Sequence, residues 1–99
     1  MPYIHFVALK FKPTASEASI AEIFAFLKTF QTFLPGLLEY SFGLYESPEG
    51  LNKGFTHAFT MKFADKAARD SYFPHPQHEV VKNMIIAAID DVMCFDYEM

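Results

Sequence analysis

The chain has 99 residues, of which 52% are hydrophobic and 17% aromatic, and its formal net charge is −4. A chain this short holds one hydrophobic core, so we expect a single domain over residues 1–99. The acidic balance and the absence of a basic cluster exclude the usual nucleic-acid-binding surface and an electrostatic attachment to membranes. No apolar run approaches the roughly 20 residues of a membrane-spanning helix. A single cysteine and no secretory leader pattern predict a cytoplasmic protein.

Hydrophobic periodicity and turn residues divide the chain into alternating strands and helices. In chain order we expect a strand over residues 3–12, a helix from a capping box at Thr14–Glu17 to about Phe33, a strand over 37–45, a loop over 47–54, a strand over 55–63, two helical stretches over 65–72 and 78–88, and a strand over 92–98. Gly43 marks an expected bulge, and Asp65 is expected to cap the short helix.

This order predicts an α+β fold, a ferredoxin-like βαββαβ antiparallel sheet with its helices on one face. The first strand is apolar on both faces at its centre, with Val7 and Leu9 on one side and Phe6 and Ala8 on the other. Because helices cover only one face, the second face must be buried against another chain. A homodimer is therefore expected, since twofold pairing is the commonest solution.

Four segments carry a resemblance to a known family. They are HFVALKF at 5–11, SPEGLNKGFTHAF at 47–59, RDSYFPHPQH at 69–78 and FDYE at 95–98. Through them the whole chain resembles the stress-responsive A/B barrel (Dabb) family. The resemblance implies a dimeric α/β barrel and, from a characterised plant member, an intramolecular aldol condensation that needs no cofactor.

The resemblance also implies the residues of a site. Its acid/base pair falls on Tyr72 and His78. The expected substrate-binding residues are His5, Val7, Leu9, Phe24, Leu27, His57, Phe59 and Met61. Leu27 replaces an aromatic hydroxyl of the plant member, and Phe59 and Met61 differ in shape from the aliphatics expected there. These departures argue against the same substrate.

The chemistry of the pair follows from its expected place at the start of a helix. The positive helix end favours a neutral, basic imidazole at His78, which can take the acidic proton between two carbonyl groups. Tyr72 can donate a hydrogen bond to the enolate that forms. The structural alternative is that His78 only caps its helix and Tyr72 only anchors the loop before it.

Other candidate groups give weaker predictions. His75 and His78 have the spacing of a metal-ligand pair, but Pro76 and the lack of a third ligand argue against a functional metal. Asp90, Asp91 or Asp96 can bind at most an incidental divalent cation. Cys94 is expected to be a buried filler residue.

His5 and His57 lie near the starts of two strands that are antiparallel neighbours in the expected sheet. They should therefore sit roughly 10 to 14 Å apart, at about 3.4 Å per residue, too far to share one ligand within a protomer. One is expected in the pocket and the other at a rim or interface, and His57 is the better candidate for an ordinary core histidine.

Three functions remain open from the sequence. The first is a cofactor-independent cyclase or lyase acting on a polyketide-like or β-dicarbonyl compound. The second is a non-catalytic dimer that binds an apolar small molecule or acts in stress responses. The third is a cofactor-free monooxygenase of the α+β barrel type, which the HPQH segment at 75–78 disfavours.

Overall fold

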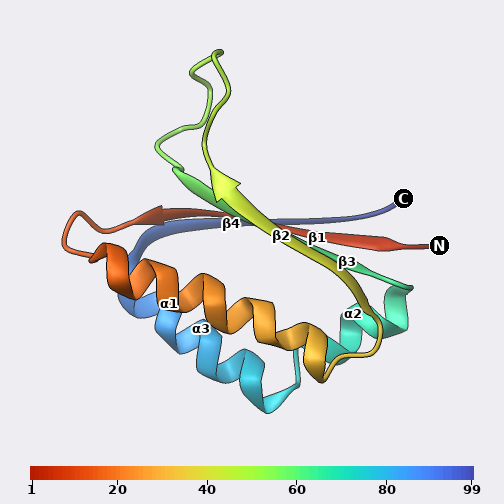
Figure 1. The fold of residues 1–99 in the computed structure, drawn as a ribbon. Coiled ribbons are helices and arrows are strands. Elements are labelled where there is room, and N and C mark those ends of the chain that lie inside the picture. Colours follow the sequence, from red (N-terminus) through yellow and green to blue (C-terminus); the bar gives the residue numbers. More distant parts are fainter.

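A four-stranded antiparallel sheet forms the centre of the molecule, and the helices lie against one of its faces (Figure 1). The computed structural model describes residues 1–99. Its elements are β1 (Tyr3–Phe11), α1 (Glu17–Lys28), a 3-10 turn (Thr29–Thr32), β2 (Leu37–Leu44), β3 (His57–Phe63), α2 (Lys66–Tyr72), α3 (Pro76–Ala88) and β4 (Ile89–Glu98). The strand order is β2-β3-β1-β4, which confirms the ferredoxin-like α+β fold expected from the sequence.

Polar caps set where the first two helices begin. Helix α1 follows Ser16, whose hydroxyl accepts a hydrogen bond from the backbone N–H of Ser19 at 3.1 Å. The capping box expected at Thr14 was wrong, because the chain first makes a turn in which the N–H of Ala15 donates to the Lys12 carbonyl. Helix α2 follows Asp65, whose carboxylate accepts from the N–H of Ala68 at 2.8 Å, as predicted.

Helix α3 begins earlier than expected. The Nδ1 atom of His75 accepts from the backbone N–H of Gln77 at 3.1 Å and caps the helix. Pro76 then occupies the first helical position, where its missing N–H would have no intrahelical partner in any case. His78 therefore lies within the first turn of α3, three residues after the capping residue His75.

The strands differ from the sequence expectation at their ends. The irregularity in β2 lies between Leu37 and Glu39 and not at Gly43, whose position pairs regularly with Ala58. Strand β4 starts directly at Ile89, because β1 is long enough for Phe11 to pair with it. Just before β2, a Cβ atom on Gly36 would lie 2.4 Å from that of Ala68, so glycine permits the close approach of α2.

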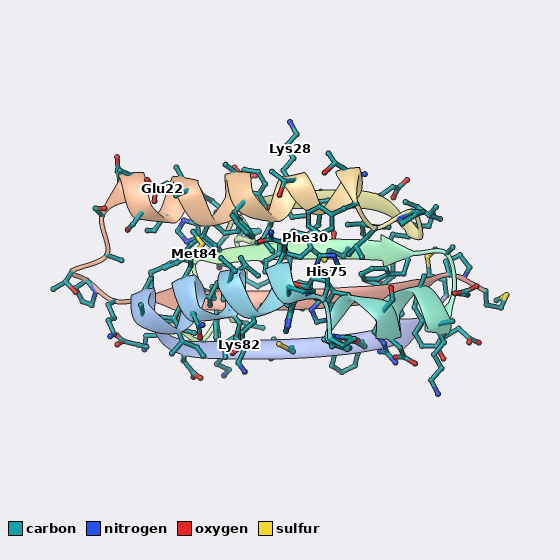
Figure 2. The ribbon with its side chains drawn as sticks, turned by 90° about the horizontal axis from the view of Figure 1, so that it is seen from below. Glu22, Lys28, Phe30, His75, Lys82 and Met84 are labelled. Atoms are coloured by element: carbon teal, nitrogen blue, oxygen red, sulfur yellow. The ribbon has the colours of Figure 1, made fainter.

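The core lies between the helices and the inner face of the sheet. Its thirteen buried members are Val7, Leu9, Ile23, Phe24, Leu27, Phe30, Leu34, Leu37, Phe59, Met61, Phe63, Tyr72 and Val81. Seen from the helix side, α1 and α3 run side by side along the strands, and Phe30 of the 3-10 turn lies between them (Figure 2). No helix is both long enough and apolar enough to cross a membrane.

The outer face of the sheet has no helix on it. Strand pairing places Phe6 opposite Phe95 and Ala8 opposite Met93 on this face, with Tyr97 beside them. Phe95 is 59% exposed, Tyr97 50% and Met93 45%. The loop between β2 and β3 projects from this side of the sheet, away from the helices (Figure 1). The predicted contrast between a covered and an uncovered apolar face is thus present.

Candidate active site

A cavity of about 360 Å³ lies between α3, the end of α2 and the inner face of β1 and β4. Its thirteen lining residues are His5, Val7, Phe59, Tyr72, Phe73, His78, Val81, Lys82, Ile85, Ile86, Ile89, Val92 and Cys94. Most of this wall is apolar, and its polar groups are few. Such a wall is typical of a small-molecule site, in which a few polar groups set the orientation of a largely apolar ligand.

Tyr72 and His78 meet at this cavity. Their ring centroids are 4.6 Å apart and the rings are inclined at 70°. Tyr72 is only 2% exposed, and its hydroxyl makes no hydrogen bond within the protein. Every fully buried side-chain oxygen in the protein has a hydrogen-bond partner. The Tyr72 hydroxyl has none, so it must retain accessible surface, and the space beside it is the cavity. The phenol is therefore free to donate to a ligand.

Burial sets the protonation of both groups. Burial raises the pKa of the Tyr72 hydroxyl above its ordinary value, and the neighbouring Cys94 adds to the rise, so the phenol stays protonated. Burial lowers the pKa of His78 below 6.5, opposed by a hydrogen bond with the Phe73 backbone and assisted by His5 and Lys82. His78 is therefore a neutral base near pH 7, although burial rather than the helix end is the main cause.

His5 brings a second imidazole to the same cavity. Its ring centroid lies 5.6 Å from that of Tyr72, and its Nδ1 atom is 2.7 Å from Oδ1 of Asp96 on the neighbouring strand β4. The other carboxylate oxygen of Asp96 accepts from the Arg69 guanidinium at 2.5 Å. Phe73, which is 42% exposed, lies against both His5 and His78 at the edge of the cavity.

The structure divides the residues proposed for substrate binding into two groups. His5, Val7 and Phe59 line the same cavity as Tyr72 and His78. The other inner-face candidates, Leu9, Phe24, Leu27 and Met61, are buried in the core and do not line it. Leu27 in particular has no exposed surface, so its replacement of an aromatic hydroxyl affects packing.

His57 lies away from Tyr72 and His78. It pairs with Leu9, while His5 pairs with Met61, so the two histidines are separated along the strands by about 14 Å at roughly 3.4 Å per residue. The ring of His57 packs on Phe11 at 4.9 Å. It lines a separate cavity of about 260 Å³ beneath the β2–β3 loop, and burial lowers its pKa.

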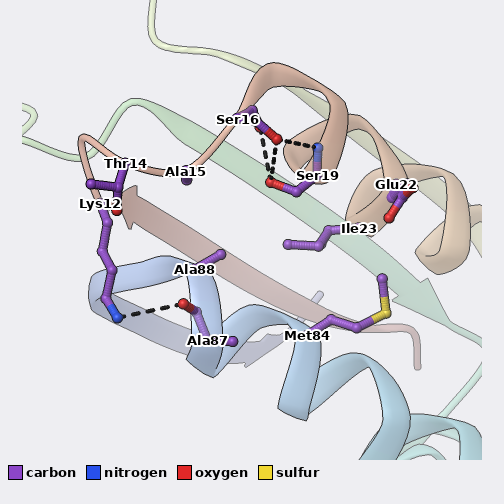
Figure 3. A pocket seen from close by; sticks show the side chains of 10 residues that line it. All are labelled: Lys12, Thr14, Ala15, Ser16, Ser19, Glu22, Ile23, Met84, Ala87 and Ala88. Atoms are coloured by element: carbon purple, nitrogen blue, oxygen red, sulfur yellow. Dashed lines mark hydrogen bonds between the residues drawn. The ribbon is translucent and has the colours of Figure 1, made fainter.

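A third cavity, of about 380 Å³, lies where the start of α1 meets the end of α3 (Figure 3). Three of its polar side chains make structural contacts. The ammonium of Lys12 lies 3.4 Å from the Ala87 carbonyl at the end of α3, and Ser16 and Ser19 bond one another at the start of α1. Lys12 and Glu22 also line this space, but no imidazole or phenol does, so the cavity at Tyr72 is the better candidate site.

One sequence expectation near the site needs correction, that for Cys94. Cys94 is exposed and lines the cavity, where a buried filler residue was expected, because its side chain points to the inner face that α3 does not fully cover. His75 does not face His78 as a ligand partner but caps α3 and stacks on Phe33 at 4.6 Å. No group of three or more His, Cys, Asp or Glu side chains is arranged to hold a metal ion.

Sequence reasoning did not assign Asp96 and Arg69 to the site. Asp96 carried a signal, since it occupies an inward position in the alternation of β4, two residues after Cys94. A carboxylate on a covered face needs a partner, and here it has two. Arg69 gave no local signal, because an arginine in the last turn of a short helix is an ordinary surface residue.

Comparison with known proteins settles the family. The model of the Stress responsive A/B Barrel Domain matches residues 4–99. The chain belongs to this family.

Two plant relatives and one bacterial structure illustrate the likeness. The Arabidopsis thaliana stress-response A/B barrel domain-containing protein HS1 is 27% identical over 97 residues, covering 98% of this chain and 89% of the relative. Olivetolic acid cyclase of Cannabis sativa is 24% identical over 93 residues, covering 94% and 92%. A dimeric ferredoxin-like protein of unknown function from Jannaschia sp. CCS1 is 29% identical, with a TM-score of 0.91 and full coverage of both chains.

Proposed function

We propose that this A/B barrel protein is a cofactor-independent cyclase or lyase that promotes aldol-type proton transfer on a polyketide-like or other β-dicarbonyl small molecule. His78 acts as the base and Tyr72 as the acid. The observation that carries the proposal is a neutral imidazole beside an unpaired phenol at the wall of one apolar cavity. The Cannabis sativa relative, which is named as a cyclase, supports it.

The cavity fits this class of compound in size and polarity. Its volume of about 360 Å³ lies within the usual range of roughly 300–1,000 Å³ for ligand pockets. The aliphatic side chains of α3 and β4, among them Ile85, Ile86 and Val92, suit an alkyl chain. A carbonyl oxygen needs a donor, and the hydroxyl of Tyr72 supplies one beside the base His78.

The reaction proceeds in balanced steps. His78 takes a proton from the carbon between two carbonyl groups, and the electron pair moves to a carbonyl oxygen, which gives an enolate. The enolate carbon attacks a second carbonyl of the same molecule, so that a C–C bond forms and the attacked oxygen becomes negative. Tyr72 donates its hydroxyl hydrogen to that oxygen. The imidazolium of His78 then gives its proton to the phenolate oxygen of Tyr72, and both side chains regain their starting forms.

We also infer that the protein acts as a homodimer whose outer sheet faces pack together. The support is the cluster of exposed apolar residues on that face and the dimeric state named for the Jannaschia protein. Since the cavity lies on the inner face, each protomer would hold a site of its own. Two copies would thus carry two sites on opposite sides of one closed barrel.

The decisive experiment measures ring closure of linear poly-β-keto thioesters by the purified protein. The variant His78→Ala should lower the rate by about 10²–10⁴, the usual contribution of a general base. His75→Asn serves as a control, because it removes a neighbouring imidazole outside the cavity while keeping a residue that caps helices well. If no closure occurs and His78→Ala changes only ligand affinity, the protein is a non-catalytic binder.

A further inference from the structure

A line of hydrogen-bonded side chains connects Arg69 on α2, through Asp96 on β4, to His5 in the wall of the cavity. The guanidinium of Arg69 donates to Oδ2 of Asp96 at 2.5 Å. Oδ1 of Asp96 lies 2.7 Å from Nδ1 of His5. These residues belong to three different elements, so the line exists only in the folded protein.

The line is shielded from water. The side chains of His5, Arg69 and Asp96 are 7%, 15% and 22% exposed. The guanidinium also lies over the ring of Tyr3, 5.2 Å from its centroid. A planar cation held in this way has little freedom to turn.

These contacts determine which nitrogen of His5 carries the proton. A carboxylate accepts hydrogen bonds and has no hydrogen to donate, so the close contact between Asp96 and His5 requires a hydrogen on Nδ1. In the neutral ring, Nε2 then has a free lone pair. Nε2 makes no hydrogen bond within the protein, and since no fully buried polar side-chain atom is unpaired, it opens onto the cavity. His5 itself is 5% exposed.

We propose that Arg69 and Asp96 are positioning residues that hold His5 as the Nδ1–H tautomer, so that its Nε2 accepts a hydrogen bond from a hydroxyl group of the ligand. The tyrosine stands between the two imidazoles, with ring centroids 5.6 Å from His5 and 4.6 Å from His78. The site therefore selects a ligand that presents an O–H group, such as the enol form of a β-dicarbonyl. The choice of an enol as the ligand rests on the proposed function. The assignment of the His5 tautomer does not depend on it.

The tautomer can be tested directly by ¹⁵N nuclear magnetic resonance of the histidine rings at a pH where His5 is neutral. We expect Nδ1 of His5 to be protonated and Nε2 to be unprotonated. In Asp96→Asn the amide can donate to Nδ1, so the proton should move to Nε2. Asp70→Asn is the matched control, because Asp70 also contacts Arg69, at 2.8 Å, but does not contact His5.

A pair of simple probes tests the selectivity. The ligands are 4-hydroxyacetophenone and 4-methoxyacetophenone, which differ in one O–H donor, and their binding is measured by titration calorimetry. The hydroxyl compound should bind the unmodified protein about tenfold more tightly, the value of one hydrogen bond. Asp96→Asn should abolish this preference, and Asp70→Asn should keep it. Arg69→Lys, which keeps the charge but not the planar fork, should weaken it.

The inference is overturned if the unmodified protein carries the proton on Nε2 of His5, or if Asp96→Asn leaves the tautomer and the probe preference unchanged. Neither measurement needs turnover. A protein that closes no ring but shows the expected tautomer and preference would contradict the proposed function alone. Loss of ring closure in His78→Ala together with an Nε2–H tautomer at His5 would contradict this inference alone.

Discussion

The ring of Tyr72 stands edge-on to the ring of His78, with centroids 4.6 Å apart, and its hydroxyl has no partner in the protein. A hydroxyl without a partner adds little to stability, so Tyr72→Phe should leave the melting temperature nearly unchanged. Ring closure should nevertheless fall by about 10²–10⁴ because the acid is lost. Tyr40→Phe is the control, since that hydroxyl donates to the Phe24 carbonyl at 3.1 Å outside the cavity. It should lower stability by about 1 kcal/mol and keep the rate.

The pH dependence of turnover follows from His78. Burial lowers the pKa of His78 below 6.5, so the basic form should predominate near neutral pH. The rate should therefore be flat above pH 7 and fall as the pH drops through the lowered pKa. A rate that still rises between pH 7 and 8 would contradict a neutral His78 and would point to another base.

Stability should depend on pH in the same direction. The folded-state pKa values of His57 and His78 are both lowered by burial, so the unfolded chain binds more protons below pH 6.5. The free energy of unfolding should therefore decrease as the pH falls from 6.5 through the lowered pKa values, and it should be fully restored above that range. Urea unfolding at several pH values measures this. In the double variant His57→Gln, His78→Gln the decrease should become smaller.

The outer sheet face gives a prediction for assembly. Phe95 is 59% exposed on that face and lies opposite Phe6. Phe95→Lys should convert the dimer to a monomer, because the pairing of two sheets would bury an unpaired ammonium group. Light scattering after size-exclusion chromatography measures the mass. Val80→Lys, at a 45% exposed position on α3, should leave the dimer intact, and dissociation of both variants would refute this interface.

A substitution at Leu27 tests whether packing in the core and binding in the cavity are independent. It has no exposed surface and packs in the core cluster, so Leu27→Ala should lower the free energy of unfolding by about 2–5 kcal/mol. Affinity for the acetophenone probes should stay within about twofold when measured where the variant is fully folded, because Leu27 does not line the cavity. A changed affinity with unchanged stability would place Leu27 in the site.

The order of strands and helices was enough to predict the fold and the helix coverage of one sheet face. Alternation along β1 separated Val7 and Leu9, which are buried, from Phe6 on the outer face. It also placed His5 and His57 at opposite ends of a strand pair, as the register confirms. These properties depend on which face a residue occupies, and period-two alternation encodes that locally.

Contacts between distant segments could not be predicted in this way. The pairing of His5 with Asp96 joins residues 91 positions apart and depends on the register between β1 and β4. The choice of Ser16 over Thr14 as the cap depends on a turn after Lys12. Serine and threonine both cap helices well, so the residue types alone do not decide between the two positions. Sequence alone therefore located Tyr72 and His78 through a resemblance, while their neighbours became visible only in the folded chain.

Strand β4 forms one wall of the cavity and is also an edge of the sheet, since β1 is its only neighbour. Its free edge exposes backbone groups that a second chain can pair with, the usual first step of aggregation. Asp90, Asp91 and Glu98 are exposed along this strand, so two such edges repel each other near neutral pH. The strand that encloses the ligand thus also carries the charges that keep two molecules from pairing edge to edge.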